Sequence, residues 1–391
     1  MIINRYITKV IANDVLEKMV FIGGPRQVGK TTLSKNIIAQ KFNSCEYYNW
    51  DNREDRKKIL NPGWPGNTDL LIFDEIHKYR YWKSFIKGEY DKLKEKYKFI
   101  VTGSARLDVY RKGGDSMMGR YHYYHLHPFS LAEACSKTYW VKPFDELNIP
   151  CVNETDIFLS LDKFGGFPEP FIKQNSRTLR RWHNERIDRI IREDIRDITA
   201  IKDFSGMMLL CDMLPQRAGS SLSINSLRED IGVSHKALTN WFNIFESMYY
   251  CFRIYPYAGQ NFRSLKKEPK LFLYDWSEIE DDAARFENLI ASHLLKFVHF
   301  LRDYEGYRME LKYLRSVEKK EVDFLITCNN KPWFAVEAKL NRTKISKNLF
   351  YFQSKLDIPF LFQVIKKSDV DIVINNKFRV VSADRFLAGL I

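Results

Sequence analysis

The chain has 391 residues, of which 45% are hydrophobic, and its formal net charge is +13. This length is sufficient for roughly two or three domains with substantial cores. No apolar run approaches about 18 residues, and the start of the chain lacks a signal peptide's long apolar core, so we expect a globular protein without a membrane-spanning helix. The six cysteines are scattered and form no C-x-x-C pair, which argues against a disulfide scaffold or a zinc site and favours a reducing cytoplasm.

The surplus of positive charge favours a polyanionic partner, above all nucleic acid. The alternative is a lysine- and asparagine-rich proteome in which basic surfaces are general. A specific nucleic-acid-binding element in the chain is needed to separate these two explanations.

A phosphate loop is the clearest local pattern in the chain. Residues 24–32 match G-x-x-x-x-G-K-[ST], an apolar run at 19–22 precedes them, and a helical pattern at 33–38 follows. Such a loop lies between a strand and a helix N-terminus, where backbone N–H groups surround the phosphates. Lys30 would reach the terminal phosphates and the Thr31 hydroxyl would bind Mg²⁺, so we expect ATP and Mg²⁺ as cofactors. The predicted nucleotide-binding residues are Gly24, Pro25, Arg26, Gln27, Val28, Gly29, Lys30, Thr31 and Thr32.

Two acidic residues end the next apolar run, and their position downstream of a phosphate loop predicts hydrolysis. Asp74 and Glu75 follow the run at 70–73. Asp74 is placed to complete the Mg²⁺ site, and Glu75 is placed to polarise the attacking water as a general base. Another apolar run at 97–101 leads to Ser104, a small polar residue able to sense the γ-phosphate. Further apolar runs bring the number of predicted strands to about five, and helical stretches separate them. This alternation predicts a three-layer α/β fold.

Four segments in this order resemble a prokaryotic family of AAA-type ATPases whose C-terminal domain is mostly without an assigned function: 30–33, 71–77, 102–104, and 119–120 followed by 127–133. The likeness covers nearly the whole chain. It implies a sensor role for Ser104 and makes Arg120 a candidate arginine finger, which stabilises charge on the γ-phosphoryl group and often comes from a neighbouring subunit. Such a finger is compatible with homo-oligomerisation through the ATPase domain. A salt bridge unrelated to phosphate is the alternative for Arg120, and Arg217 is a competing candidate finger.

Residues 156–257 show mainly helical spacing, and one part of this region predicts a winged helix-turn-helix. A short helix at 224–231 and a longer helix at 235–249 flank a glycine turn, and an apolar strand at 251–255 would form the wing. The second helix of such a unit enters the major groove of DNA, and here it offers four polar side chains: Lys236, Thr239, Asn240 and Asn243. The alternative is a winged helix that serves as a structural lid or contacts protein.

The segment from residue 270 onward returns to alternating strands and helices and contains a nuclease-like set of residues. Asp323 lies on one predicted strand, and Glu337 and Lys339 lie two residues apart, and so on one face, of the next. This is the pattern of the PD-(D/E)xK nuclease fold, in which the two acids hold Mg²⁺ and the lysine orients or activates water. Glu287 on the preceding predicted helix supplies a further acid. An inactive fold retained for binding is the alternative.

Strand register tests this nuclease hypothesis. In an antiparallel hairpin, directly opposed residues share a face of the sheet. A two-residue turn at 329–330 pairs Asp323 with Val336, whereas a three-residue loop at 329–331 pairs it with Glu337. The metal site therefore requires an odd-length loop or a β-bulge, and carboxylates on opposite faces would exclude it.

Together the patterns predict an α/β protein of three domains: an AAA-type phosphate-loop ATPase at 1–145, a helical winged-helix domain at 146–262, and a restriction-endonuclease-like α/β domain at 263–391. We expect a cytoplasmic ATPase that acts on nucleic acid, in particular DNA, and has no membrane partner. Nuclease activity stays open. The alternatives are an ATP-gated DNA-binding switch with a catalytically dead nuclease fold, and a chaperone-like AAA machine that works on protein.

Overall fold

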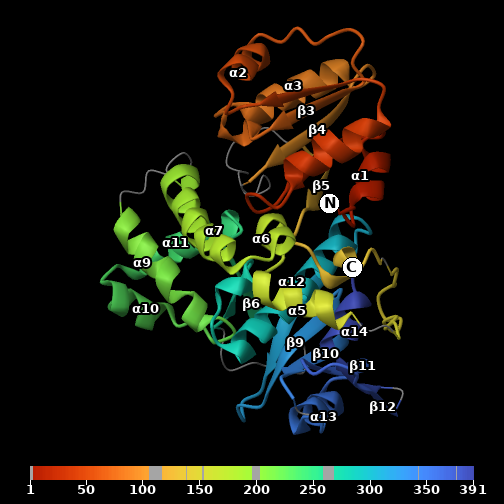
Figure 1. Ribbon diagram of the computed structural model, residues 1–391, viewed down its shortest axis with the longest axis vertical. Helices are drawn as coiled ribbons and strands as arrows, with labels where there is room; N and C mark the ends of the chain where they lie inside the picture. Colours follow the sequence, from red (N-terminus) through yellow and green to blue (C-terminus); the bar gives the residue numbers. More distant parts are fainter. Residues whose placement is uncertain are drawn as a thin grey trace.

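The computed structural model of the protein describes residues 3–104, 117–137, 139–151, 154–195, 203–258, 268–341, 343–375 and 377–391. Within these residues the strands form a five-stranded sheet and an eight-stranded sheet. Figure 1 shows the first sheet at one end of the molecule, the second at the other end, and a group of helices to one side. No helix in the described ranges combines the length and the apolar character that crossing a membrane requires.

The N-terminal sheet is parallel throughout, and its strands lie in the order β2 (Cys45–Asn49), β3 (Leu70–Asp74), β4 (Lys98–Gly103), β1 (Met19–Gly23) and β5 (Tyr121–His125). Its strands are short apolar runs, which suit a parallel sheet that is covered on both faces. The helices α1 (Thr8–Asp14) and η1 (Thr32–Ile38) pack on one face, where Ile22 and Leu33 share a core. The helices α2 (Arg53–Leu60) and α3 (Trp82–Leu93) pack on the other face.

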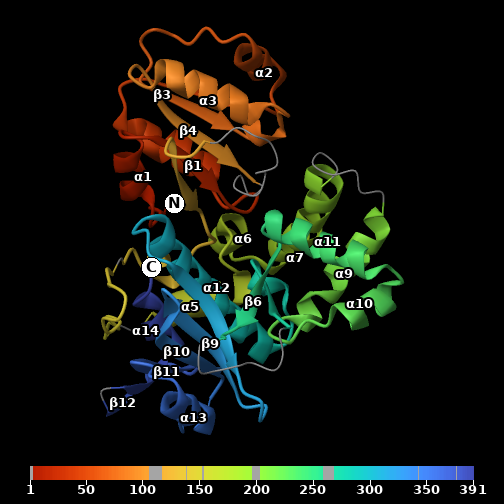
Figure 2. The same ribbon diagram turned by 180° about the vertical axis from the view of Figure 1, so that it is seen from behind.

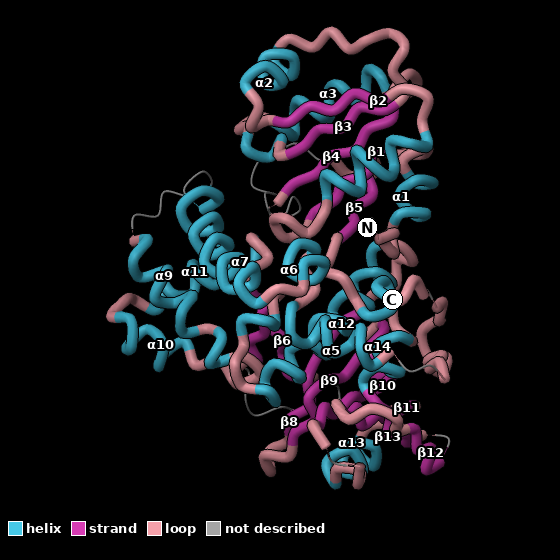
Figure 3. The backbone as a smooth tube through the Cα atoms, in the orientation of Figure 1, coloured by secondary structure: helices cyan, strands magenta, loops and turns pink. Residues whose placement is uncertain are grey.

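The middle of the chain is mainly helical, in agreement with its spacing. Figure 3 shows that α7, α9, α10 and α11 gather to one side of both sheets. The helices of this region are α4 (Leu131–Ala134), α5 (Thr155–Phe164), α6 (Pro168–Lys173), α7 (Ser176–Arg189), η4 (Ile190–Ile195), α9 (Phe204–Met213), η5 (Pro215–Arg217), α10 (Ile224–Ile231) and α11 (His235–Ser247).

A tight turn joins α10 to α11. Gly232 ends α10 with a φ of 79°, a conformation that favours glycine. Ser234 caps the N-terminus of α11, and its side chain accepts a hydrogen bond from the N–H of Ala237 at 3.1 Å. The strand β6 (Cys251–Pro256) follows and pairs antiparallel with β7 (Lys270–Leu273). An isolated bridge adds Ser221 to β7, so a strand segment before α10 and two strands after α11 lie side by side.

The C-terminal sheet is mixed and contains β6 and β7. Its order is β12-β13-β11-β10-β9-β8-β6-β7, with the remaining strands β8 (Met309–Arg315), β9 (Glu321–Cys328), β10 (Lys331–Lys339), β11 (Phe360–Ile365), β12 (Asp371–Asn375) and β13 (Phe378–Ser382). Strands β8 to β10 are antiparallel neighbours, and β11 is parallel to β10. The predicted domain boundary at 262/263 lies outside the described residues, and β6 and β7 on its two sides pair within one sheet.

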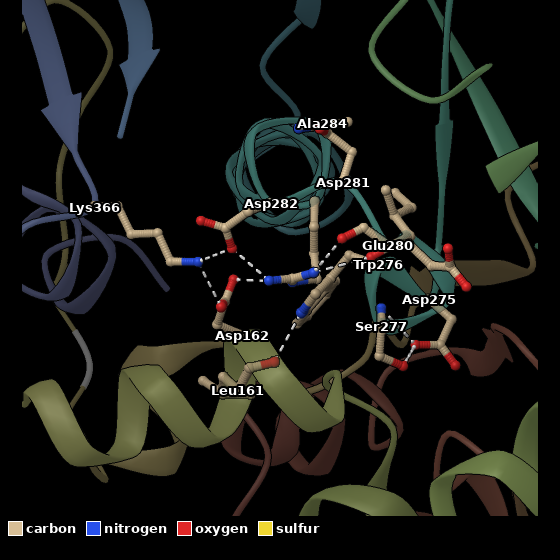
Figure 4. A network of polar contacts seen from close by, with 12 residues as sticks. Leu161, Asp162, Asp275, Trp276, Ser277, Glu280, Asp281, Asp282, Ala284 and Lys366 are labelled. Atoms are coloured by element: carbon tan, nitrogen blue, oxygen red, sulfur yellow. Dashed lines mark hydrogen bonds and ion pairs between the residues drawn. The ribbon is translucent and has the colours of Figure 1, made fainter. Parts of the chain in front are cut away.

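The 22-residue helix α12 (Asp282–Asp303) connects the two sheets. Figure 2 shows it between them, and it packs against β5 of the first sheet and against β7, β8 and β10 of the second. The polar network of Figure 4 holds its start: Lys366 Nζ donates to Asp162 of α5 at 2.7 Å and to Asp282 at 2.6 Å. Arg285 pairs with the same Asp282, so the first turn of α12 is tied to α5 and to the end of β11. This anchoring fixes Glu287, which lies one turn further on. The other helices here are η6 (Trp276–Glu278), α13 (Lys347–Lys355) and α14 (Ala383–Ala388).

Candidate functional site

The phosphate loop follows β1 and folds around the ammonium group of its own lysine. Lys30 is buried, and its Nζ donates to the carbonyl oxygens of Gly24 and Pro25 at 2.9 and 2.8 Å. Gly29 has a φ of 100°, a backbone conformation that glycine adopts without a steric penalty. The helix η1 begins at Thr32, directly after the loop, as the sequence pattern predicts. The loop therefore has the strand, glycine and helix geometry on which phosphate binding depends.

Three hydroxyl groups meet at Asp74, at the carboxyl end of β3. Thr31 Oγ1 and the Tyr47 hydroxyl donate to Asp74 Oδ2, at 2.7 and 2.6 Å, and the Thr102 hydroxyl donates to Oδ1. A hydroxyl and a carboxylate are oxygen ligands of the kind that Mg²⁺ prefers, so Thr31 and Asp74 fit the metal that accompanies a triphosphate. Burial raises the pKa of Tyr47, and the charge of Asp74 raises it further, so this residue remains a hydrogen-bond donor. Sequence reasoning did not assign Tyr47.

Glu75 lies beside this cluster and contacts the predicted sensor. Ser104 Oγ donates to Glu75 Oε2 at 3.0 Å. Glu75 has a φ of 55°, and such left-handed conformations of non-glycine residues cluster at active sites. His77 Nε2 lies 3.6 Å from the same carboxylate oxygen, and burial lowers the pKa of His77. The hydrogen bond from Ser104 thus orients the carboxylate of Glu75, as a general base requires. Sequence reasoning gave His77 no role, although it lies within the segment 71–77.

Arg120 does not reach this chain's phosphate loop. Its carbonyl oxygen accepts a hydrogen bond from the N–H of Met19, at the opposite end of β1 from the loop. Its guanidinium group donates to both oxygens of Asp91 on α3, at 2.7 and 3.0 Å. Arg120 therefore does not belong to the ATP site of its own chain, and a finger role stays a prediction for a neighbouring subunit's site. The competing candidate Arg217 lies 3.4 Å from Asp230 of α10.

Two tyrosine hydroxyl groups connect the phosphate loop to the middle of the chain. Tyr123 of β5 and Tyr249, which lies just after α11, have hydroxyl oxygens 2.8 Å apart. Both hydroxyl groups lie close to Gly23, the residue before the loop. A Cβ atom added to Gly23 would collide with the Tyr123 hydroxyl and would lie 2.8 Å from the Tyr249 hydroxyl. The helix-turn-helix region therefore contacts the base of the phosphate loop.

Two histidines at the end of β5 and just after it extend this contact to α12. His125 Nδ1 lies 2.7 Å from Asp303 Oδ2, and His127 Nε2 lies 2.8 Å from His299 Nδ1. Burial lowers the pKa of His127 well below its ordinary value, so His127 is held without a positive charge. The ATPase sheet and α12 are joined by side-chain hydrogen bonds.

The second candidate site brings together the four residues of the nuclease hypothesis. Glu287 comes from α12, Asp323 from β9, and Glu337 and Lys339 from β10. Lys339 Nζ lies 2.8 Å from Glu337 Oε1, and Asp323 Oδ2 accepts a hydrogen bond from the N–H of Ala338 at 2.9 Å. Glu337 is 4% exposed, and its Oε2 has no hydrogen-bond partner among the described residues.

A β-bulge supplies the register that this site needs. A two-residue turn at 329–330, with positive φ at both residues, joins β9 to β10 in place of the three-residue loop considered above. This turn alone would pair Asp323 with Val336. The pairing shifts by one residue around Trp333, which brings Asp323 opposite Glu337 on one face of the sheet.

Two residues that sequence reasoning did not assign complete the cluster. Lys270 Nζ lies 3.0 Å from Glu287 Oε1, 2.8 Å from Glu321 Oε1 and 3.5 Å from Asp323 Oδ1. Lys270 begins β7 and Glu321 begins β9, so neither belongs to the Asp and Glu-x-Lys pattern. Only the arrangement of the strands in the sheet identifies them.

Burial and mutual repulsion shift the protonation of this cluster. Burial raises the pKa of Glu287 to about 8, and the charge of Asp323 adds to the rise. Burial also raises the pKa of Glu337 to about 7, where Asp323 adds and Lys339 opposes. Burial would lower the pKa of Lys270, but the surrounding carboxylates outweigh this effect and raise it. Closely spaced carboxylates that repel one another are the arrangement that a divalent cation stabilises.

Three family models match successive parts of the chain. An AAA domain matches residues 16–135, a domain of unknown function (DUF8612) matches 162–277, and another domain of unknown function (DUF4143) matches 283–386. The first match contains the five-stranded sheet and every residue of the candidate ATP site. The other two matches meet between η6 and α12.

The chain is also similar to whole proteins. An uncharacterized protein of Methanocaldococcus jannaschii is 23% identical over 377 residues, covering 89% of this chain and 82% of that protein. An uncharacterized protein of Mycobacterium tuberculosis is 18% identical over 346 residues, covering 85% of this chain and 72% of that protein.

Two solved structures give weaker likenesses. The Thermotoga maritima RuvB Holliday junction branch migration motor has a TM-score of 0.31 at 16% identity, covering 64% of this chain and 90% of that chain. Bacteroides Pif1 bound to ssDNA has a TM-score of 0.23 at 16% identity, covering 42% and 57%. Scores this low establish no shared overall fold. The chain contains an AAA domain at residues 16–135, followed by two regions that match domains of unknown function.

Proposed function

We propose that the protein is a Mg²⁺-dependent ATPase whose nucleotide cycle controls action on DNA by a winged helix and a nuclease-like domain. The observation that carries the proposal is the phosphate loop with Thr31 hydrogen-bonded to Asp74 and, beside it, Glu75 hydrogen-bonded to Ser104. The AAA domain match at 16–135 supports the ATPase part.

Each residue of the ATP site has a separate task in this proposal. Lys30 leaves the loop carbonyls that now hold it and neutralises terminal phosphate oxygens. Thr31 and Asp74 hold Mg²⁺, which supplies further charge neutralisation at the phosphates. Glu75 takes a proton from the attacking water, and Ser104 keeps its carboxylate in position.

The proposal for the C-terminal domain is a PD-(D/E)xK-like fold. The chain order α12, β8, β9, β10, α13, β11 supports it, because the helix and the two central strands supply the acids and the lysine. Asp323 and Glu337 would hold Mg²⁺, Glu287 would add an acid, and Lys339 would orient water for attack on a phosphodiester. The unpaired Oε2 of Glu337 fits a metal ligand, since a buried carboxylate oxygen without a partner is costly.

The helix α11 is the proposed DNA-contacting element. Its first turns and the preceding residue line a surface pocket of about 670 Å³ formed by Ser234, His235, Lys236, Ala237, Thr239, Asn240 and Asn243. The four polar residues predicted to contact DNA all belong to this set. A helix N-terminal half that presents polar side chains in this way suits the major groove.

Lys236→Ala is expected to weaken DNA binding and to reduce the slope of log affinity against log salt by about 0.9, because one phosphate contact is lost. Fluorescence anisotropy with a short duplex at several salt concentrations measures this slope. The matched control is Lys173→Ala, which removes an exposed lysine on α6. An unchanged slope in Lys236→Ala would place the DNA elsewhere, and a wild type without salt dependence would favour the chaperone-like alternative.

Tyr249→Phe is expected to weaken the coupling between nucleotide and DNA. The change removes only the hydroxyl that contacts Tyr123 beside the phosphate loop, a hydrogen bond of about 1 kcal/mol, or about a fivefold change in an equilibrium constant. The measurement is DNA affinity with and without a non-hydrolysable ATP analogue. Tyr97→Phe, which removes a hydroxyl bonded to the backbone of Trp64 and Pro65, is the control. If both variants respond to nucleotide as the wild type does, Tyr249 does not transmit the signal.

One set of assays tests the whole proposal. Purified protein is incubated with plasmid, linear and single-stranded DNA, with Mg²⁺ or Mn²⁺, and with or without ATP. We expect ATP hydrolysis that Lys30→Ala abolishes, and metal-dependent DNA cleavage that Glu337→Ala abolishes. Absence of ATP hydrolysis in the wild type would contradict the first part, and absence of cleavage under every condition would contradict the second.

One observation favours a second candidate function, an ATP-gated DNA-binding switch with an inactive nuclease fold. Lys270 lies among the carboxylates, and no group of three or more His, Cys, Asp or Glu side chains within the described residues is arranged to hold a metal ion. A switch predicts that Asp323→Ala preserves function while Lys30→Ala removes it. The DNA cleavage assay distinguishes this function from the first.

The proposal also includes a cytoplasmic location and self-assembly through the ATPase domain. In such an assembly Arg120 or Arg217 of a neighbouring subunit acts as the arginine finger, since neither residue lies at the ATP site of its own chain.

A further inference from the structure

The ammonium group of Lys270 lies at the centre of the carboxylate cluster. Its Nζ is within 3.0 Å of Glu287 and Glu321 and 3.5 Å from Asp323, and the residue is only 3% exposed. A lysine is rarely buried to this extent unless carboxylates pair with it. Lys270 therefore pairs with Asp323, which the nuclease hypothesis assigns to a metal, and with Glu287, the further acid of that hypothesis.

The cluster contains its own cations without a metal ion. Arg315 Nη1 lies 2.8 Å from Glu321 Oε2, and Lys339 pairs with Glu337. Four carboxylates thus face three cations: Glu287, Glu321, Asp323 and Glu337 face Lys270, Lys339 and Arg315. A divalent cation that enters this cluster competes with an ammonium group already in place, since like charges in a buried site repel strongly.

We propose that Lys270 is an internal counter-cation of the resting nuclease-like site and that it withdraws when a divalent metal binds to Asp323 and Glu337. This inference rests on the proposed function of that site and adds a regulatory element to it. Oε2 of Glu337 is buried and has no hydrogen-bond partner among the residues that the structure describes, so it can serve as a metal ligand.

Lys270 belongs to the strand that joins the cluster to the helix-turn-helix region. β7 has four residues, and the segment before α10 holds it: Gly219 N–H donates to the Leu271 carbonyl at 2.8 Å, and Ser221 bridges Lys270. The same segment lies close to the site. A Cβ atom added to Gly219 would lie 3.3 Å from Glu287 Oε2. β7 therefore links the segment before α10 to the carboxylates of α12 and β9 through the ammonium group of Lys270.

Mn²⁺ binding in nucleotide-free protein tests the proposal. Thr31→Ala serves as the background because it removes a predicted metal ligand of the ATP site, and electron paramagnetic resonance of free Mn²⁺ gives the affinity. Lys270→Met, which keeps the length but removes the charge, is expected to bind Mn²⁺ at least about tenfold more tightly. Adding Glu337→Ala is expected to abolish this gain, and the control Lys173→Met is expected to leave the affinity unchanged.

A measurement on the wild type covers the case in which Lys270→Met does not fold. Saturating Mn²⁺ is expected to increase the acylation of Lys270 by an amine-reactive reagent several-fold, as read by peptide mass spectrometry, because the ammonium group leaves its buried position. Two results would overturn the proposal while preserving the metal site. One is a folded Lys270→Met protein that binds Mn²⁺ with the same affinity as its background. The other is Mn²⁺ binding that requires Glu337 but leaves Lys270 unreactive. If Glu337→Ala leaves the Mn²⁺ affinity unchanged in every background, the proposed nuclease-like function itself is contradicted.

Discussion

Glu75→Gln is expected to slow ATP hydrolysis by about 10²- to 10⁴-fold, because a general base contributes on this order to the rate. Glutamine keeps the shape of the side chain and can still accept the hydrogen bond from Ser104, but it cannot take a proton from water. ATP binding should be preserved, since the substitution leaves Lys30 and the Thr31–Asp74 hydrogen bond in place. The loss should therefore lie in kcat, with ATP affinity within about twofold of the wild type.

Steady-state phosphate release and the affinity of a fluorescent ATP analogue, measured on the same preparations, separate these two effects. Glu54→Gln on α2 is the matched control, because this glutamate forms only an exposed pair with Lys57 and should leave both values unchanged. A Glu75→Gln protein that hydrolyses ATP at the wild-type rate would show that another group activates the water.

The ATP site could largely be predicted from the sequence because its parts lie next to one another in the chain or at strand ends. A glycine-rich loop between a strand and a helix, and acids at the end of a buried strand, are local patterns with one common structural solution. Tyr47 was not predictable in this way. Its hydroxyl reaches Asp74 only because β2 pairs with β3, and a tyrosine in a strand ordinarily indicates packing.

The carboxylate cluster shows where sequence reasoning stops. The alternation of residues placed Glu337 and Lys339 on one face, but the position of Asp323 depended on the bulge around Trp333, which no residue type announces. Lys270 lies more than fifty positions before Asp323, and it enters the site because β7 extends the same sheet. Long-range strand order, rather than local propensity, decides which charges meet.

A buried charge cluster holds the ATPase domain against α12, and it involves Glu133 of the 127–133 segment. Glu133 Oε1 accepts hydrogen bonds from Arg5 Nε at 2.9 Å and from the N–H of Tyr6 at 3.0 Å. Its Oε2 pairs with Lys296 of α12, and all three charged side chains are nearly inaccessible. Burial would raise the pKa of Glu133, but Arg5 and Lys296 outweigh it and hold the pKa at about 2.

Glu133→Gln is expected to lower the free energy of unfolding by about 3–5 kcal/mol, because it leaves Arg5 and Lys296 buried without a counter-charge. Urea unfolding followed by tryptophan fluorescence measures the change. The exposed pair of Glu169 with Lys173 supplies the control, and Glu169→Gln should cost less than about 1 kcal/mol. Adding Lys296→Met to Glu133→Gln should recover part of the loss, since an unpaired buried charge is removed.

The same carboxylate determines the acid limb of the stability curve. The pKa of Glu133 in the folded protein, about 2, is below its ordinary value of 4.5, so the folded state binds this proton less readily than the unfolded state does. Its contribution, about 3 kcal/mol, is therefore fully present above about pH 5 and is lost as the pH falls toward 2. Burial lowers the pKa of Lys296 to about 7, so that group titrates in a separate window at neutral to alkaline pH. Glu133→Gln should reduce the loss of unfolding free energy between about pH 5 and 2 by about 3 kcal/mol. An unchanged acid limb of the stability curve would show that Arg5 and Lys296 do not depend on the Glu133 charge.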